Sequence, residues 1–251
     1  MGVSERDYMR RPDGDVLPYV CVPASATAVR RRCRPGDWDG AYVTWGFGIA
    51  CTIVSVVWYL AGETFYLPSP ATLDEAQARV RLIGALLELK DLISTHFCVS
   101  PQLVEQGDYY RVALYALLHY GNLSAVVGIA SVVGFGLALE VGGWVWYRML
   151  ILTVVSIGSA YLAMCIAEVH WPLCGSWGVS CAFASALAVQ PREGVGGSWI
   201  LKLCSAGFVT ACVLGMPKHL SGEYSCSAPA IGGAVSGVLM GLLGRWRDWC
   251  N

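Results

Sequence analysis

Apolar and polar stretches alternate along the chain, and six apolar segments follow a polar N-terminal stretch. An α-helix needs roughly 20 mostly apolar residues to cross a hydrocarbon core about 30 Å thick. The pattern therefore predicts an all-α membrane protein with six transmembrane helices, in which residues 1–40 form a polar, Arg-rich N-terminal arm and residues 41–251 form the transmembrane domain. The expected spans are Ala41–Ala61, Leu117–Leu139, Trp146–Ala167, Pro172–Gln190, Ser198–Met216 and Ala228–Trp246.

A long connection, Gly62–Arg111, separates the first two expected spans. Within it, apolar residues recur at helical intervals between charged ones, which predicts a helix over Leu73–Ser94. Thr72 and Glu75 have the spacing of a capping box at the start of this helix. We expect the helix to lie on the membrane surface or against the bundle, and the alternative is a short helix packed only on loops.

Composition supports a membrane protein. Hydrophobic residues make up 55% of the chain and charged residues only 14%, whereas roughly 25% of a soluble protein is charged. The net charge of −1 gives no electrostatic case for nucleic-acid binding. The cysteines form no CxxC motif, and neither a metal nor a cofactor is expected. Histidines are expected at surfaces or interfaces, with a shared metal site as the alternative: His96, His119, His170 and His219.

Basic residues are unevenly divided between the two sides of the predicted membrane domain. The side that holds both termini carries 12 of the 17 Lys and Arg residues, and the opposite side carries 5. Because basic residues concentrate on the inner side of membrane proteins, both termini are expected in the cytosol or the mitochondrial matrix.

The sixth expected span contains a glycine ladder, Gly233, Gly237 and Gly241. Four-residue spacing places these glycines on one face of a helix, where the missing side chains allow a neighbouring helix to approach closely. We expect this face to pack against the fourth span, which is also rich in small residues.

Four further stretches add a more specific pattern. They occur in a fixed order, before the second span, within it and at the start of the fourth span. They are Gly107-Asp108-Tyr109-Tyr110-Arg111, Leu117-Leu118-His119-Tyr120-Gly121-Asn122-Leu123-Ser124, Gly134-Phe135-Gly136-Leu137-Ala138-Leu139-Glu140 and Gly175-Ser176-Trp177-Gly178. Together with the glycine ladder, this order and spacing resembles the rhomboid family of intramembrane serine proteases over residues 107–244.

The resemblance implies a six-helix rhomboid-like bundle in which the catalytic groups are missing. The family places a serine nucleophile in GxSG on the fourth span and a histidine base in HxxGxxxG on the sixth, with a His and an Asn on the second span stabilising the oxyanion. His119 matches the first histidine of the second-span motif. Four positions are degenerate, namely Trp177 for the nucleophile, Ala230 for the base, Ser124 for the second histidine and Gly128 for the asparagine.

These replacements predict a pseudoprotease, because Trp has no nucleophilic oxygen and Ala cannot accept a proton. We expect the indole of Trp177 to fill the vestigial cavity beside the small residues Gly128 and Ala230. A rescued activity would need a shifted pair such as Ser176 with His219, or the use of Ser180 one turn further along.

The expected function is therefore non-enzymatic. The resemblance implies a structural or scaffold subunit of a larger membrane complex, with the mitochondrial inner membrane favoured: a respiratory, ATP synthase or protein-import assembly. The alternatives are a client-binding pseudoprotease in quality control at the endoplasmic reticulum membrane, and a residual serine protease. Expected partners are other membrane subunits and lipids, including anionic lipid such as cardiolipin. Neither a nucleic acid nor a small-molecule substrate is expected.

Two groups of side chains leave alternatives open. Glu140 and Glu168 lie at span ends and are expected at the interface, with a proton relay as the alternative. Cys98, Cys174 and Cys226 share the side opposite the termini, where they are either free thiols or contribute one disulfide.

Overall fold

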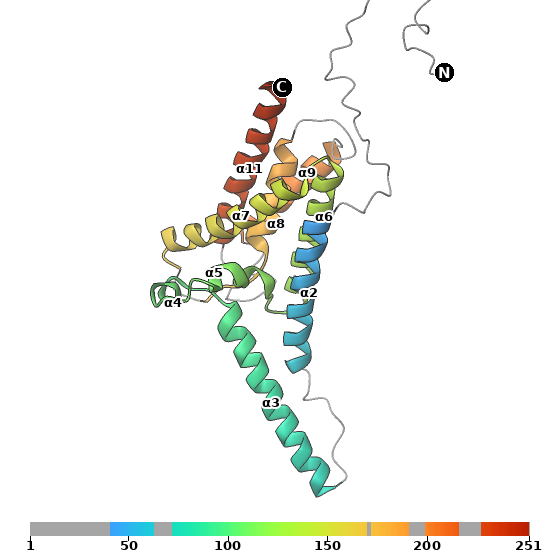
Figure 1. The fold of residues 1–251 in the computed structure, drawn as a ribbon, viewed down its shortest axis with the longest axis vertical. Coiled ribbons are helices and arrows are strands. Elements are labelled where there is room, and N and C mark those ends of the chain that lie inside the picture. The colour runs from blue at the N-terminus through green and yellow to red at the C-terminus, as the bar shows by residue number, and fades with distance from the viewer. Residues whose placement is uncertain (1–40, 63–71, 170–171, 191–198, 216–226, 251) are drawn as a thin grey trace, which may run out of the picture. The chain divides into compact units, whose positions relative to one another are not determined.

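The structure is a computed structural model that describes residues 41–62, 72–169, 172–190, 199–215 and 227–250. The described part is all-helical apart from one isolated β-bridge (Figure 1). All of its helices belong to the unit Pro35–Asn251, whereas the expected arm, residues 1–40, lies outside the described residues. The elements are α2 (Tyr42–Gly62), α3 (Leu73–Phe97), α4 (Pro101–Glu105), α5 (Arg111–Leu114), the 3-10 turn η4 (Tyr115–Leu117), α6 (Asn122–Val141), α7 (Trp146–Ile166), α8 (Trp177–Val189), α9 (Trp199–Val213) and α11 (Ser227–Cys250).

Three of the described helices, α2, α6 and α7, are long and apolar enough to cross a membrane. Shorter apolar helices occupy the other three expected positions, as α8, α9 and residues Ser227–Leu243 of α11. The prediction of an all-helical protein is thus confirmed for the described residues, and three of the six expected spans are candidates for crossing a membrane.

Two predicted helix starts are wrong. The second expected span was to begin at Leu117, but α6 begins at Asn122 because Gly121 adopts a left-handed φ of 83° that interrupts the helix. The fourth was to begin at Pro172, but α8 begins only at Trp177. Leu173 is held extended by the β-bridge to Val99, and Gly175 turns the chain with a φ of 119°.

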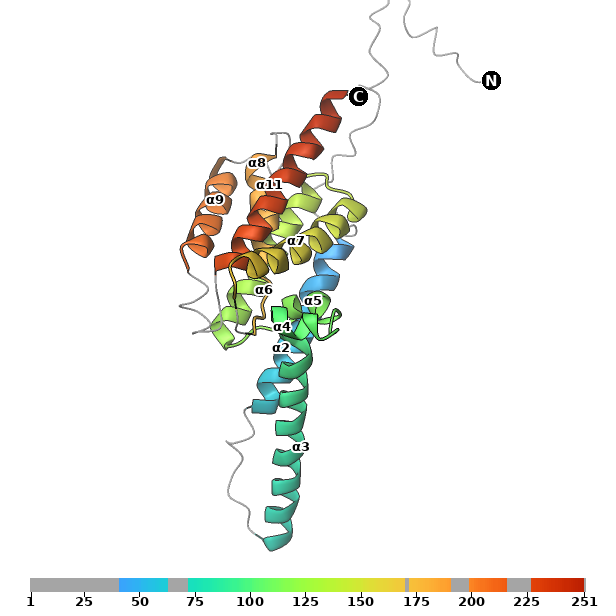
Figure 2. The ribbon, with the colours of Figure 1, turned by 90° about the vertical axis from the view of Figure 1, so that its left-hand side faces the viewer.

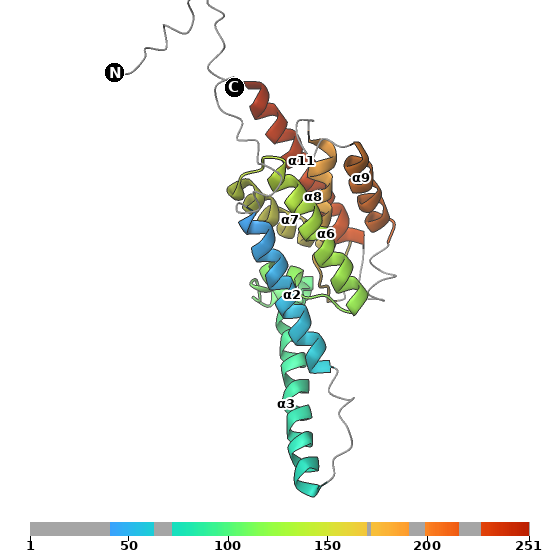
Figure 3. The same ribbon diagram turned by 90° about the vertical axis from the view of Figure 1, so that its right-hand side faces the viewer.

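Helix α8 is enclosed by its neighbours. It packs against α6, α7, α9 and α11 (Figures 2 and 3). Every residue from Trp177 to Leu187 is buried. Thirteen residues form a helix only about 20 Å long, less than the thickness of a hydrocarbon core. Protein rather than lipid surrounds α8 along these residues, so this short helix is compatible with a position in the membrane interior.

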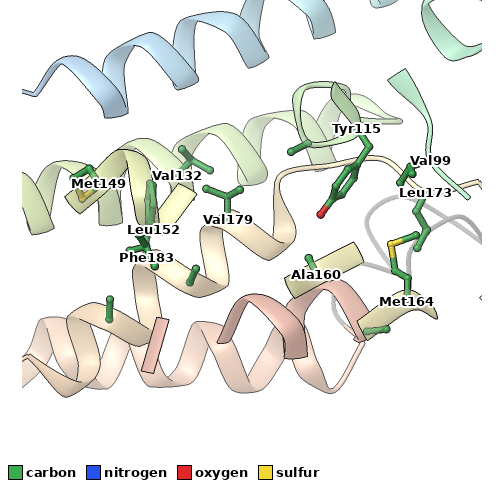
Figure 4. Close-up of a cluster of buried hydrophobic side chains, with 14 of the residues drawn as sticks. Val99, Tyr115, Val132, Met149, Leu152, Ala160, Met164, Leu173, Val179 and Phe183 are labelled. Atoms are coloured by element: carbon green, nitrogen blue, oxygen red, sulfur yellow. The ribbon is translucent and has the colours of Figure 1, made fainter. Parts of the chain in front are cut away.

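The apolar core lies between α6, α7 and α8. Val132 of α6, Leu152 of α7, and Val179 and Phe183 of α8 belong to one buried cluster (Figure 4). Each of these side chains is at most 1% exposed. Their contacts hold α8 in register with its two neighbours, so the residues at its N-terminal end are rigidly placed.

Helix α3 confirms the predicted capping box. The Glu75 N–H donates to Thr72 Oγ1 over 3.2 Å, and the Thr72 N–H donates to a Glu75 carboxylate oxygen over 3.3 Å. No residue of α3 is buried. Near its C-terminus, Trp58 Nε1 of α2 donates to Ser94 Oγ over 3.0 Å, and the Lys90 ammonium lies 4.5 Å from the centre of the Trp58 ring. The C-terminal part of α3 therefore rests on α2.

The two glutamates at span ends differ in environment. Glu168 is exposed, with a φ of 50°, just after α7. Glu140, at the end of α6, is only 8% exposed. Its carboxylate lies near Val43 and Thr44 in the first turn of α2, but both carboxylate oxygens and the Thr44 hydroxyl are buried without a hydrogen-bond partner among the described residues. The N-terminal end of a helix favours a carboxylate, which offsets part of this cost.

Candidate functional site

Five residues match or replace the catalytic motif, and these five and Ser176, which precedes Trp177, are all buried. His119 lies in the loop before α6, and Ser124 and Gly128 lie in the first and second turns of α6. Ser176 and Trp177 lie at the start of α8, and Ala230 lies at the start of α11.

A buried hydrogen-bonded pair, His119 and Ser176, lies at the centre of this group. The Ser176 backbone N–H donates to His119 Nε2 over 3.1 Å, and Ser176 Oγ lies 2.9 Å from the same nitrogen. Because Nε2 accepts the backbone bond, the ring proton of neutral His119 is assigned to Nδ1. The exposed fractions are 1% for His119 and 0% for Ser176.

Gly128 provides the room for this pair. A Cβ added at Gly128 would overlap the imidazole of His119 and would lie 3.3 Å from Ser176 Oγ. The side chain that covers Gly128 is therefore His119, whereas the sequence had suggested that Trp177 would fill this space.

Trp177 fills the other half of the site. Its indole is 3% exposed and clusters with Ala230, Cys181 and Cys212. Partly buried apolar side chains complete its surroundings: Val127 of α6, Phe208 and Val213 of α9, and Ala234 of α11. A buried apolar cluster thus occupies the positions that the resemblance assigns to nucleophile and base.

Ser180 belongs to a polar contact between α6 and α8. Ser131 Oγ lies 2.8 Å from the Gly128 carbonyl oxygen and 2.9 Å from Ser180 Oγ, so the serines hydrogen-bond across the two helices. That Ser131 belongs to this contact was not predicted from the sequence. The spacing of Ser124, Gly128 and Ser131 could have indicated it, because residues at these helical intervals lie on one face of α6.

The glycine ladder of α11 lies directly on α8. A Cβ at Gly233 would overlap the Gly178 carbonyl, and one at Gly237 would overlap the Ala182 carbonyl. A Cβ at Gly241 would collide with the Val189 side chain.

A second glycine face of α11 was not predicted. Gly232 packs against the α7 backbone at Ser159, whose hydroxyl donates to the Gly232 carbonyl over 2.9 Å. The two faces together place α11 close to both α7 and α8, which positions Ala230 beside Trp177.

The chemistry open to this arrangement is limited by access. An imidazole nitrogen 2.9 Å from a serine oxygen is in the correct range for a general base and its hydroxyl. A substrate cannot reach a pair that is this fully enclosed. His219, the partner suggested for Ser176 by the sequence, lies outside the described residues, as does His170.

The remaining polar groups do not form a metal centre within the described ranges. His96 Nδ1 lies 2.7 Å from the Tyr110 hydroxyl. No cluster of three or more His, Cys, Asp or Glu side chains capable of holding a metal ion occurs among residues that the structure describes.

The buried imidazole predicts an acid-sensitive fold. Burial lowers the pKa of His119 from its ordinary value of 6.5 to about 4. Between these values the unfolded chain binds a proton that the folded chain excludes, so stability falls as the pH is lowered from 6.5 to 4. The loss attributable to His119 between pH 7 and pH 4.5 is expected to be about 2 kcal/mol. Thermal melting of the purified protein at pH 7 and pH 4.5 measures it.

A His119→Gln variant is the control, because glutamine cannot titrate in this range. Its melting temperature should change less between the two pH values than that of the unmodified protein. Equal pH dependence in both proteins would show that folding does not lower the pKa of His119.

No protein-family model matches the chain, and no curated protein matches it.

Proposed function

We propose that this protein is a rhomboid-like pseudoprotease with six transmembrane helices that acts as a structural subunit of a larger membrane complex. The observation that supports this proposal best is the buried contact of Trp177 with Ala230. These two residues occupy the positions that the resemblance assigns to the nucleophile and the base, and neither side chain can perform that role. Function then depends on the shape of the helical bundle and on its contacts with other molecules.

Apolar side chains on α7 and α9 are available for such contacts. Val154, Leu162 and Ile166 on α7 and Leu203 on α9 are each about 60% exposed or more. In a membrane these faces meet lipid tails or the helices of neighbouring subunits. The Arg-rich arm, residues 1–40, is proposed to bind a partner or an anionic lipid such as cardiolipin. The favoured location is the mitochondrial inner membrane, with the termini in the matrix.

The test of the subunit role is purification from native membranes in a mild detergent, followed by identification and quantification of the proteins that co-purify. A stable set of partners in fixed stoichiometry supports a structural subunit. A changing mixture of unrelated membrane proteins would instead support the alternative, client binding in quality control at the endoplasmic reticulum.

We expect the protein to be proteolytically inert. The purified chain should neither cleave model transmembrane substrates nor react with a fluorophosphonate probe, because no accessible serine in the described part of the chain has a base beside it. The measurement is mass-spectrometric mapping of the probe after incubation, with an active intramembrane serine protease as the positive control.

One observation favours a second function, residual serine chemistry. Ser176 and His119 are already hydrogen-bonded, and an opening of the bundle that exposed them would present a serine with its base. Fluorophosphonate attached to Ser176, and lost in Ser176→Ala and His119→Gln variants, would establish this second function and overturn the first.

A further inference from the structure

Two cysteines that are far apart in the sequence meet where the loop after α3 crosses the segment before α8. Val99 and Leu173 form an antiparallel β-bridge, in which the Val99 N–H donates to the Leu173 carbonyl over 2.9 Å and the Leu173 N–H donates to the Val99 carbonyl over 2.8 Å. Figure 4 shows the two residues next to each other. In this register Cys98 lies opposite Cys174, because the next pair in an antiparallel bridge advances on one strand and retreats on the other.

The register brings the two cysteines into the range that a disulfide requires. Val99 and Leu173 exchange both hydrogen bonds, so Cys98 and Cys174 form the adjacent, non-hydrogen-bonded pair, whose Cα atoms are typically about 4.5 Å apart. Disulfides join Cα atoms separated by about 4.4–6.8 Å. Both thiols are free in this structure, and they are near enough for each to shift the pKa of the other.

Polar groups around Cys98 favour its thiolate, which is the reactive form of a cysteine. The contact with the Cys174 thiol lowers the pKa of the Cys98 thiol despite its burial, and the Tyr120 hydroxyl and the charge of Arg111 contribute further. The Tyr120 hydroxyl lies 2.9 Å from Cys98 Sγ. Cys98 is buried and Cys174 is partly exposed, so an oxidant from solvent approaches the pair from the Cys174 side. Burial raises the pKa of the Cys174 thiol, so Cys98 supplies the thiolate of the pair.

We propose that Cys98 and Cys174 are a disulfide-forming pair that covalently joins the loop after α3 to the segment before α8. The oxidant is a small-molecule or protein disulfide. Attack of one thiolate on it forms a mixed disulfide and releases one thiol. Attack of the second cysteine then forms the Cys98–Cys174 bond and releases the other thiol, so two electrons and two protons pass to the oxidant.

The consequence for the site is rigidity. Cys174 lies two residues before Ser176, whose backbone N–H binds His119. The disulfide would therefore hold the entry to α8 in the position that keeps His119 and Ser176 enclosed. In the orientation expected from the basic residues, the pair also lies on the side opposite the termini. The compartment on that side of most membranes is the more oxidising one. The proposal does not depend on the subunit role.

A second thiol contact in the bundle provides a matched control. Cys181 of α8 and Cys212 of α9 are neighbours in the apolar cluster around Trp177, and both residues are fully buried. Without access to an oxidant, this second pair is expected to stay reduced under conditions that oxidise Cys98 and Cys174.

The test is oxidation of the purified full-length chain with glutathione disulfide, followed by alkylation of the remaining thiols and peptide mapping by mass spectrometry. The expected result is the loss of two alkylatable thiols, recovery of a Cys98–Cys174 linked peptide, and a melting temperature about 5 °C or more above that of the reduced protein. Cys181→Ser should form the same link, whereas Cys98→Ser and Cys174→Ser should not.

Peptide mapping of the oxidised, unmodified chain tests the proposal even if a serine variant folds poorly. Full alkylation of both cysteines after oxidation would overturn it. So would a link from either cysteine to a different one such as Cys226, or a glutathione adduct at Cys174 that Cys98 does not displace.

Discussion

Replacing Trp177 by alanine is expected to destabilise the folded bundle by about 3–5 kcal/mol, the cost of truncating a buried Trp. The indole is 3% exposed and touches side chains of α6, α9 and α11, so its removal leaves a cavity where these helices meet α8. The loss is measured as a lower melting temperature, or a lower midpoint of denaturant unfolding, in the same detergent.

The matched control is Trp146→Ala, because Trp146 of α7 is 58% exposed. Its effect on stability should be small. Equal effects of the two substitutions would show that Trp177 is not a packing residue. Trp177→Ser should also remain proteolytically inactive, since the residue beside it, Ala230, cannot act as a base.

Replacing Gly237 by alanine is expected to cost about 3 kcal/mol, the upper end of the usual penalty for inserting one methyl group into a packed contact. A Cβ at this position would overlap the backbone carbonyl of Ala182, and a backbone carbonyl cannot rotate away as a side chain does. The two helices must then separate along the glycine ladder. The expected result is a lower melting temperature and a lower yield of folded protein, and Gly237→Leu should prevent assembly of the bundle.

Gly207→Ala is the same chemical change in the neighbouring helix α9, at a position where no atom lies within 4 Å of an added Cβ. It should leave stability unchanged or raise it by up to about 1 kcal/mol, because alanine favours the helix over glycine. Melting of Gly237→Ala at the temperature of the unmodified protein would contradict the close contact between α8 and α11.

Several features of this protein followed from the sequence because they are local. The length and hydrophobicity of an apolar run predict a helix wherever that helix packs, and α2 and α7 begin within one residue of their expected starts. The capping box at Thr72 uses bonds between residues three apart, so it could be identified without the fold. The glycine ladder likewise depends only on helical periodicity, which places Gly233, Gly237 and Gly241 on one face.

Other features were decided by tertiary structure. The helix starts at Asn122 and Trp177 depend on left-handed glycines and on a β-bridge to a distant segment. The hydrogen-bond partner of Ser176 is His119, 57 residues away in the sequence. The imidazole of His119, rather than the indole of Trp177, fills the space beside Gly128.

The pairing of Cys98 with Cys174 shows the physical reason for this division. Both cysteines were visible in the sequence, on the same side of the predicted membrane domain. Their partnership is set by the register of Val99 on Leu173, which exists only once α3 and α8 are in place. Local patterns determine helices and their faces, because those depend on neighbouring residues. Which side chains meet in the interior depends on how distant helices pack, and only the assembled bundle determines that.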